Sequence, residues 1–201
     1  MQHENDTLAN NQWFESDIKF NQLYPRHIAN LDSRHWTPLN VAKKAGKYLA
    51  AEKGARVLDI GSGVGKFCLT AAFYNPKAIF YGIEQRKELV DHANKAKQTL
   101  GLENVHFITA NLTDIKLTDY EHFYFYNSFY ENLVETDHID NNIWHSERLY
   151  EKYNRNLYVQ MKKLGTGTRI ASFHSLEEDM PNGFHLIGSE IEDLLKFWIK
   201  I

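Results

Sequence analysis

The residues best suited to chemistry lie in a glycine-rich run, DIGSGVG, that extends from Asp59 to Gly65. The run follows the apolar stretch RVLDI and precedes KFCLTAAFY, so a strand is expected to end and a helix to begin here. Glycines at such a turn let the backbone approach a ligand at the sheet edge where open α/β folds bind their ligands. The turn residues expected to contact that ligand are Gly61, Ser62, Gly63 and Gly65.

The side chains around this turn indicate the kind of ligand. A dinucleotide fingerprint, GxGxxG, needs its third glycine where this chain has Lys66, which argues against a nicotinamide oxidoreductase. The carboxylate of Asp59 would repel a pyrophosphate but suits a positively charged amino group. Glu84 ends the second expected strand, where a carboxylate can accept both ribose hydroxyls, and Gln85 beside it can face an adenine.

The motifs VLDIGSGVG and YGIE together resemble those of class I S-adenosylmethionine-dependent methyltransferases, over about residues 36–129. The resemblance implies that the cofactor is S-adenosylmethionine. It also implies that Asp59 and the three glycines surround the methionine part of the cofactor and that Glu84 binds its ribose.

The same resemblance implies two further contacts with the cofactor. Asn111 and Leu112, after the third strand, are expected to flank the adenine. Many members of the family carry an acid in place of Asn111, but an amide can still bond to the adenine amino group. Trp36-Thr37-Pro38 resembles a segment that closes over the cofactor carboxylate in related enzymes, which makes Thr37 a candidate; an ordinary helix cap at Thr37 is the alternative.

The end of the fourth strand carries the residues expected to act on the methyl acceptor. Asn127 can offer a carbonyl oxygen to an amine, and Phe129 can wall the channel or face a cation. A loop cap and a core aromatic are the alternatives. The sequence Asn-Ser-Phe at 127–129 is similar to the Asn-Asn-Phe motif of the disruptor-of-telomeric-silencing class of lysine methyltransferases. That resemblance, with the acidic residues of the 131–140 stretch, favours an amine acceptor, with protein lysine among the candidates.

Other functions stay open at this stage. A methyltransferase acting on a small molecule and a non-catalytic S-adenosylmethionine-binding subunit are both compatible with these motifs. His174, at the end of the fifth strand, is a candidate base, although a structural role is commoner for such a histidine. No His, Cys and Asp cluster has metal-ligand spacing and no GxSxG elbow occurs, so neither a metal site nor covalent catalysis is expected.

The pattern of apolar segments predicts an α/β fold, with a Rossmann-like, seven-stranded, mostly parallel sheet covered by helices on both faces. Helices are expected from a cap at Thr37, over 66–74, around Leu89 to Leu100, and after a cap at Ser146. The five expected parallel strands and the C-terminal antiparallel hairpin at the sheet edge occupy 56–60, 78–84, 105–111, 122–128 and 168–174, then 183–191 and 194–201. We divide the chain into an N-terminal tail and lid-like helical segment, 1–35, and a methyltransferase domain, 36–201, with the first ten residues frayed.

Composition suggests where the protein works and with what. The net charge is −3 and the pI about 6.4, whereas proteins that grip phosphate backbones usually carry a basic face, so no nucleic-acid partner is expected. No apolar run approaches the length needed to cross a bilayer, so no membrane partner is expected. The single cysteine, Cys68, and an N-terminus unlike a signal peptide favour a cytoplasmic location.

Overall fold

A computed structural model of the 201-residue chain describes residues 11–126, 129–133, 139, 145–175 and 180–201. The tail that we expected to be frayed, 1–10, lies outside the described residues. No helix in the described part of the chain is both long enough and apolar enough to cross a membrane.

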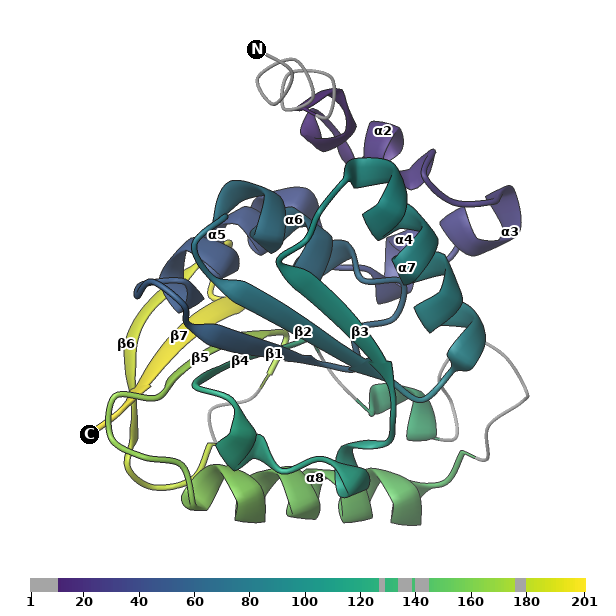
Figure 1. The fold of residues 1–201 in the computed structure, drawn as a ribbon. Helices are drawn as coiled ribbons and strands as arrows, with labels where there is room; N and C mark the ends of the chain where they lie inside the picture. Colours follow the sequence, from purple (N-terminus) through teal and green to yellow (C-terminus); the bar gives the residue numbers. More distant parts are fainter. Residues whose placement is uncertain (1–10, 127–128, 134–138, 140–144, 176–179) are drawn as a thin grey trace.

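The centre of the molecule is one seven-stranded sheet with the strand order β3-β2-β1-β4-β5-β7-β6 (Figure 1). The first five strands are parallel, and β7 runs antiparallel to both β5 and β6. This confirms the predicted mostly parallel sheet with a C-terminal hairpin. The strands are β1 (Arg56–Ile60), β2 (Ile79–Glu84), β3 (Val105–Thr109), β4 (His122–Tyr126), β5 (Arg169–Phe173), β6 (Phe184–Glu190) and β7 (Leu195–Lys200).

Helices cover both faces of this sheet, as predicted. Three of them, α5 (Leu39–Leu49), α6 (Lys66–Tyr74) and α7 (Lys87–Leu100), lie on one face, and α8 (Glu147–Lys162) lies on the other (Figure 1). Residues Lys66 to Ala72 of α6 are all buried, which explains why its sequence is apolar on every side. Short 3-10 turns, η2 (Leu112–Asp114), η3 (Leu117–Asp119) and η4 (Tyr130–Asn132), complete the α8 face.

The two expected helix caps have different outcomes. Ser146 caps α8 as predicted, because its hydroxyl accepts a hydrogen bond from the backbone N–H of Leu149 at 3.2 Å. The cap at Thr37 was wrong: α5 begins after Pro38, which supplies no side-chain cap. The hydroxyl of Thr37 instead bonds to the hydroxyl of Tyr124 on β4, at 2.9 Å.

The N-terminal segment forms four short elements beside α6 and α7 (Figure 1). They are η1 (Gln12–Phe14), α2 (Asp17–Asn21), α3 (Arg26–Ala29) and α4 (Asp32–His35). Phe14 and Phe20 are almost fully buried and belong to the same apolar core as α5 and α6. The segment therefore packs on the sheet domain, while the boundary between residues 35 and 36 stays a prediction.

Candidate cofactor and active site

The candidate site lies at the carboxyl ends of β1 and β4, where the strand order reverses. From β1 the chain builds outward through β2 to β3, and then returns to place β4 on the other side of β1. Open α/β sheets bind ligands at such a switch point, because the two connections leave the strand ends in opposite directions. The DIGSGVG turn directly follows β1 and therefore occupies this crevice.

The glycines of the turn are required by its backbone. Gly61, Gly63 and Gly65 have φ angles of 77°, 53° and 84°, a region that other residues rarely adopt. At Gly65 there is a second reason, because an added Cβ would overlap the ring of Phe107. The turn is thus held close to the sheet and opens toward the crevice.

Two pockets meet at Gly61, which lines both of them. We call them the Glu84 pocket, of about 420 Å³, and the Asp59 pocket, of about 320 Å³. The Glu84 pocket is lined by Ile60, Gly61, Ile83, Glu84, Gln85, Ala110, Asn111, Leu112, Phe129 and Tyr153. The Asp59 pocket is lined by His35, Trp36, Thr37, Asp59, Gly61, Ser62, Val64, Lys66, Phe67, Tyr124 and Tyr126.

Glu84 is positioned by the turns at the ends of β1 and β2. One carboxylate oxygen accepts the backbone N–H of Gly63 at 3.2 Å, and the other accepts that of Arg86 at 2.9 Å. The guanidinium of Arg86 lies 3.7 Å from the same carboxylate. Each carboxylate oxygen has more than one acceptor position, so Glu84 can also accept hydroxyl donors from a ligand.

Asn111 organises the far side of the Glu84 pocket. Its amide nitrogen donates to the side-chain oxygen of Gln85 at 3.2 Å and to the hydroxyl of Tyr153 at 2.9 Å. The ring of Phe129 lies 5.3 Å from that of Tyr153, between centroids. Together with the apolar Leu112 these groups form a flat, partly polar wall that suits a purine ring.

Asp59 is the most perturbed acid of the site. Its side chain is buried, and burial raises its pKa to about 8, although a hydrogen bond from the thiol of Cys68 at 3.6 Å acts in the opposite direction. The nearby charge of Glu84 raises this pKa further. A cationic group in the Asp59 pocket would favour the ionised carboxylate and lower the pKa again.

The other polar groups of the Asp59 pocket also fit an amino-acid ligand. The hydroxyl of Ser62 is buried and has no hydrogen-bond partner among the described residues. This hydroxyl lies beside the backbone of Gly82, so it would have to turn toward the pocket to bond to a carboxylate ligand, which would recover the free energy that an unpaired buried hydroxyl costs. Tyr124, which holds Thr37 at the pocket, is fixed by stacking on Phe67 with 3.8 Å between ring centroids. The pocket therefore combines an acid for an amino group with hydroxyls for a carboxylate.

The N-terminal segment is fastened to the glycine turn by contacts that sequence reasoning missed. Lys66, the first residue of α6, is only 2% exposed in its side chain and forms ion pairs with Asp17 at 2.7 Å and Asp32 at 2.6 Å. The hydroxyl of Tyr24 donates to the backbone oxygen of Val64 at 3.0 Å. A lysine that opens an otherwise apolar helix was the available signal, because a buried lysine requires acidic partners.

The structure brings nearly all of the predicted cofactor residues to this crevice. Each of them lines at least one of the two pockets, except Gly63 and Gly65, which belong to the glycine turn itself. Their role in binding stays a prediction. Sequence reasoning did not single out Tyr153, which bonds to Asn111, or Tyr124, a buried core residue that also bonds to Thr37.

Only some of the residues expected to act on the methyl acceptor lie in the described part of the chain. Asn127 and most of the acidic 131–140 stretch lie outside the described residues. Phe129 lines the Glu84 pocket, on the side of Asn111, and has a φ of 77°. His174 is exposed beyond the end of β5, with its ring 5.5 Å from that of Tyr126, and burial lowers its pKa.

A family model described as a methyltransferase domain matches residues 51–162, which include the glycine turn, Glu84 and Asn111. The chain belongs to this family. The match confirms the prediction of a class I methyltransferase domain with S-adenosylmethionine as its cofactor.

Curated relatives of this domain include tRNA (guanine-N(7)-)-methyltransferases. The protein from Synechococcus sp. (strain JA-3-3Ab) is 51% identical over 55 residues, which are 27% of this chain and 23% of that protein. The protein from Trichormus variabilis is 34% identical over 86 residues, which are 43% of this chain and 40% of that protein. The chain thus spans less than half the length of these relatives.

Solved structures share the fold at low identity. TrmN from Thermus thermophilus matches with a TM-score of 0.61 and 18% identity, over 88% of this chain and 53% of that one. An RNA methyltransferase from Salinibacter ruber, crystallised with S-adenosyl-L-homocysteine, matches with a TM-score of 0.54 and 19% identity, over 82% of this chain and 92% of that one.

These comparisons correct one expectation and weaken another. The expectation of no nucleic-acid partner was wrong, because the curated relatives named above are tRNA methyltransferases. Net charge misled us, since a chain of charge −3 can still gather its basic residues on one element. The same relatives give no support to the narrower resemblance to lysine methyltransferases.

Proposed function

We propose that this protein transfers a methyl group from S-adenosylmethionine to a base in RNA. The observation that carries the proposal is the pair of pockets that meet at Gly61, one suited to a nucleoside and the other to an amino acid. Few ligands other than S-adenosylmethionine combine these two parts, and its sulfonium supplies an already activated methyl group.

The residues of each pocket have separate roles in this proposal. In the Asp59 pocket, Asp59 receives the ligand's amino group, while Ser62 and Thr37 receive its carboxylate. In the Glu84 pocket, Glu84 accepts the ribose hydroxyls. The wall formed by Gln85, Asn111 and Leu112 holds the adenine.

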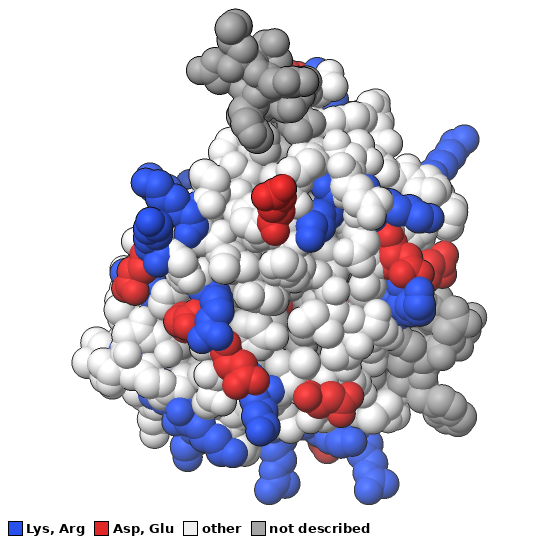
Figure 2. Space-filling view, viewed as in Figure 1, with Lys and Arg blue, Asp and Glu red and all other residues white. Residues whose placement is uncertain are grey.

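An RNA acceptor is supported by α8 as well as by the relatives. Arg148, Lys152, Arg155 and Lys162 are exposed and recur at intervals that place them along one side of this helix. Figure 2 shows Lys and Arg side chains gathered along the bottom of the molecule, where Figure 1 draws α8. Tyr153, on the other side of the same helix, lines the Glu84 pocket, so an RNA bound along the basic side of α8 would have to extend around the helix to bring a base to the site.

The chemistry asks little of the protein beyond positioning. A base nitrogen with a free lone pair, such as N7 of guanine, attacks the methyl carbon while the carbon–sulfur bond breaks, and no proton has to be removed. A lysine, by contrast, must first lose its proton. For the lone pair to attack in line, the site must orient the base and exclude water. Asn127 stays a candidate for this role, and Phe129 would take it only from its place beside the adenine wall of the Glu84 pocket.

The proposal is tested by following a radiolabelled methyl group from S-adenosylmethionine into tRNA, ribosomal RNA, lysine peptides and small amines. We expect label in RNA, recovered as a methylated nucleoside after digestion, and its loss in Glu84→Ala. Label that enters only peptides or amines would refute the RNA acceptor, whereas failure to bind S-adenosylmethionine would refute the site itself.

The α8 surface is tested separately with the double variant Lys152→Glu/Arg155→Glu. RNA binding should weaken by about tenfold or more. The slope of the logarithm of the binding constant against the logarithm of salt concentration should become shallower by about two, because two phosphate contacts are lost. The matched control is Lys53→Glu/Lys77→Glu, which changes the net charge by the same amount. Both lysines are exposed and lie before the amino ends of β1 and β2, at the sheet edge away from the site. Equal losses in both variants would indicate only a general charge effect and would contradict a binding surface on α8.

A further inference from the structure

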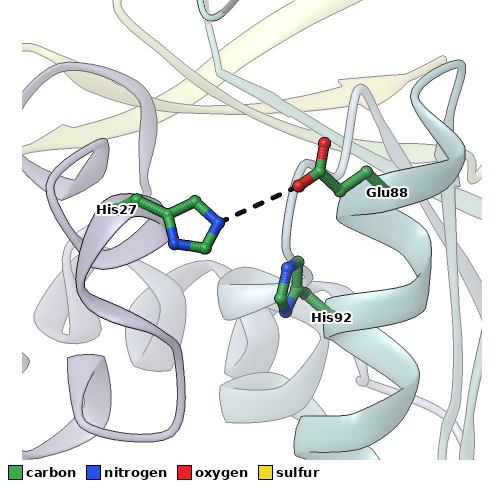
Figure 3. Close-up of side chains that lie close together, drawn as sticks. All are labelled: His27, Glu88 and His92. Atoms are coloured by element: carbon green, nitrogen blue, oxygen red, sulfur yellow. Dashed lines mark ion pairs between the residues drawn. The ribbon is translucent and has the colours of Figure 1, made fainter.

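Three potential metal ligands converge between the N-terminal segment and the sheet domain, outside the cofactor crevice. His27 lies on α3, and Glu88 and His92 lie one turn apart on α7. One ligand atom of each residue lies within 4.8 Å of those of the other two. Figure 3 shows His27 pointing toward Glu88 from the facing element, with His92 one turn further along the helix.

The contacts among these side chains are too long to be explained as a completed hydrogen-bonded cluster. Nε2 of His27 is 3.9 Å from a carboxylate oxygen of Glu88, beyond ordinary hydrogen-bond length. The rings of His27 and His92 are 6.1 Å apart between centroids and nearly perpendicular, at 73°. Two imidazoles and a carboxylate therefore lie close to one another, and the His27–Glu88 pair is not a hydrogen bond.

The ligand types and the spacing both suit a tetrahedral transition-metal ion. Metal–ligand bonds of about 2.1 Å at tetrahedral angles place ligand atoms about 3.4 Å apart. The side chains would have to move inward by roughly 1.5 Å at most, which follows from the 4.8 Å limit. Such movement is available because the side chains of His27 and Glu88 are 68% and 65% exposed. Imidazole ligands select ions of the Zn²⁺ type over Mg²⁺ and Ca²⁺, which prefer oxygen.

We propose that His27, Glu88 and His92 bind a divalent transition-metal ion of the Zn²⁺ class, with water at the fourth position, and that this ion ties α3 to α7. His27 is distant in sequence from Glu88 and His92, which are four residues apart on α7, and only the fold brings it to them.

The location gives such an ion a structural consequence. Tyr24, just before α3, binds the glycine turn at Val64, and Trp36, just after α4, lines the Asp59 pocket. An ion that joins α3 to α7 would fix the segment between these two contacts. It would thereby hold the N-terminal segment in place beside the cofactor crevice.

The proposal is tested on the full, tag-free chain, stripped of metal, by calorimetric titration with Zn²⁺, Co²⁺ and Mg²⁺. We expect one equivalent of Zn²⁺ and of Co²⁺ to bind, with no competition from Mg²⁺. His27→Gln and His92→Gln should each raise the Kd for Zn²⁺ by about tenfold or more. His185→Gln, which replaces an exposed histidine on β6, should leave it unchanged.

A second readout follows the bridge itself. Zn²⁺ should slow backbone hydrogen exchange in residues 26–29 of the parent chain and of His185→Gln, but not of His27→Gln. The variants replace exposed or half-exposed side chains, and their melting temperatures without metal report whether they fold. The proposal is overturned if no ion binds, if binding survives both histidine variants, or if bound Zn²⁺ leaves the exchange of residues 26–29 unchanged.

Discussion

The buried carboxyl of Asp59 makes S-adenosylmethionine binding depend on pH. Burial raises its pKa to about 8, so near neutral pH most molecules without ligand carry Asp59 in its uncharged form. Only the ionised form pairs with the ligand's ammonium group. The apparent association constant is therefore the intrinsic one multiplied by the fraction of protein in which Asp59 is ionised. Because this fraction grows as the pH approaches the raised pKa, affinity is expected to increase from pH 6.5 to 7.5.

The size of the effect follows from the same pKa. With a pKa of about 8, the ionised fraction is about 3% at pH 6.5 and about 24% at pH 7.5, which predicts an approximately eightfold fall in Kd. Between pH 6.5 and 7.5, each ligand that binds should also release nearly one proton, the one lost by the Asp59 carboxyl. Calorimetry in two buffers of different ionisation enthalpy measures both quantities.

Two controls isolate Asp59 in this experiment. In Asp59→Asn the affinity should be weaker and should lose most of its pH dependence, because position 59 no longer titrates. 5′-Methylthioadenosine has the nucleoside but lacks the amino acid, so its binding in the Glu84 pocket should change little with pH. The reasoning is refuted if S-adenosylmethionine and 5′-methylthioadenosine show the same pH dependence, or if affinity for S-adenosylmethionine falls between pH 6.5 and 7.5.

Three further substitutions test how the site is built. Gly65→Ala should lower the free energy of unfolding by about 2–4 kcal/mol, because it combines a left-handed backbone with overlap on Phe107, and urea unfolding measures the loss. Lys66→Met should cost about 1–3 kcal/mol and release the N-terminal segment, seen as faster tryptic cleavage before residue 35. Tyr153→Phe should weaken S-adenosylmethionine binding a few-fold by removing an acceptor from the pocket amide, measured by calorimetry.

Each of these substitutions has a control in the same chain. Gly101→Ala has a similar φ of 62° but nothing near its Cβ, so it should cost only about 1 kcal/mol. A cost equal to that of Gly65→Ala would contradict the proposed overlap. Lys87→Met removes an exposed pair with Asp91 and should leave cleavage unchanged. For Tyr153→Phe, an unchanged Kd would show that Asn111 holds its position without this hydroxyl.

The sequence by itself determined the sheet and the cofactor motif. Apolar runs of strand length indicated all seven strands, and most clearly the central strands β1, β4 and β5, because burial on both faces leaves little room there for polar residues. The glycine turn and Glu84 were visible because they depend on local spacing at strand ends. Local geometry is what a sequence encodes most directly.

Only the tertiary structure decided which distant side chains meet. It placed Tyr153 of α8 against Asn111, paired Lys66 with acids of the N-terminal segment, and bonded Thr37 to Tyr124 instead of to its own helix. It also gathered two histidines and a glutamate between α3 and α7. These contacts join residues far apart in the chain, and the packing of helices on the sheet, which no local pattern specifies, brings them together.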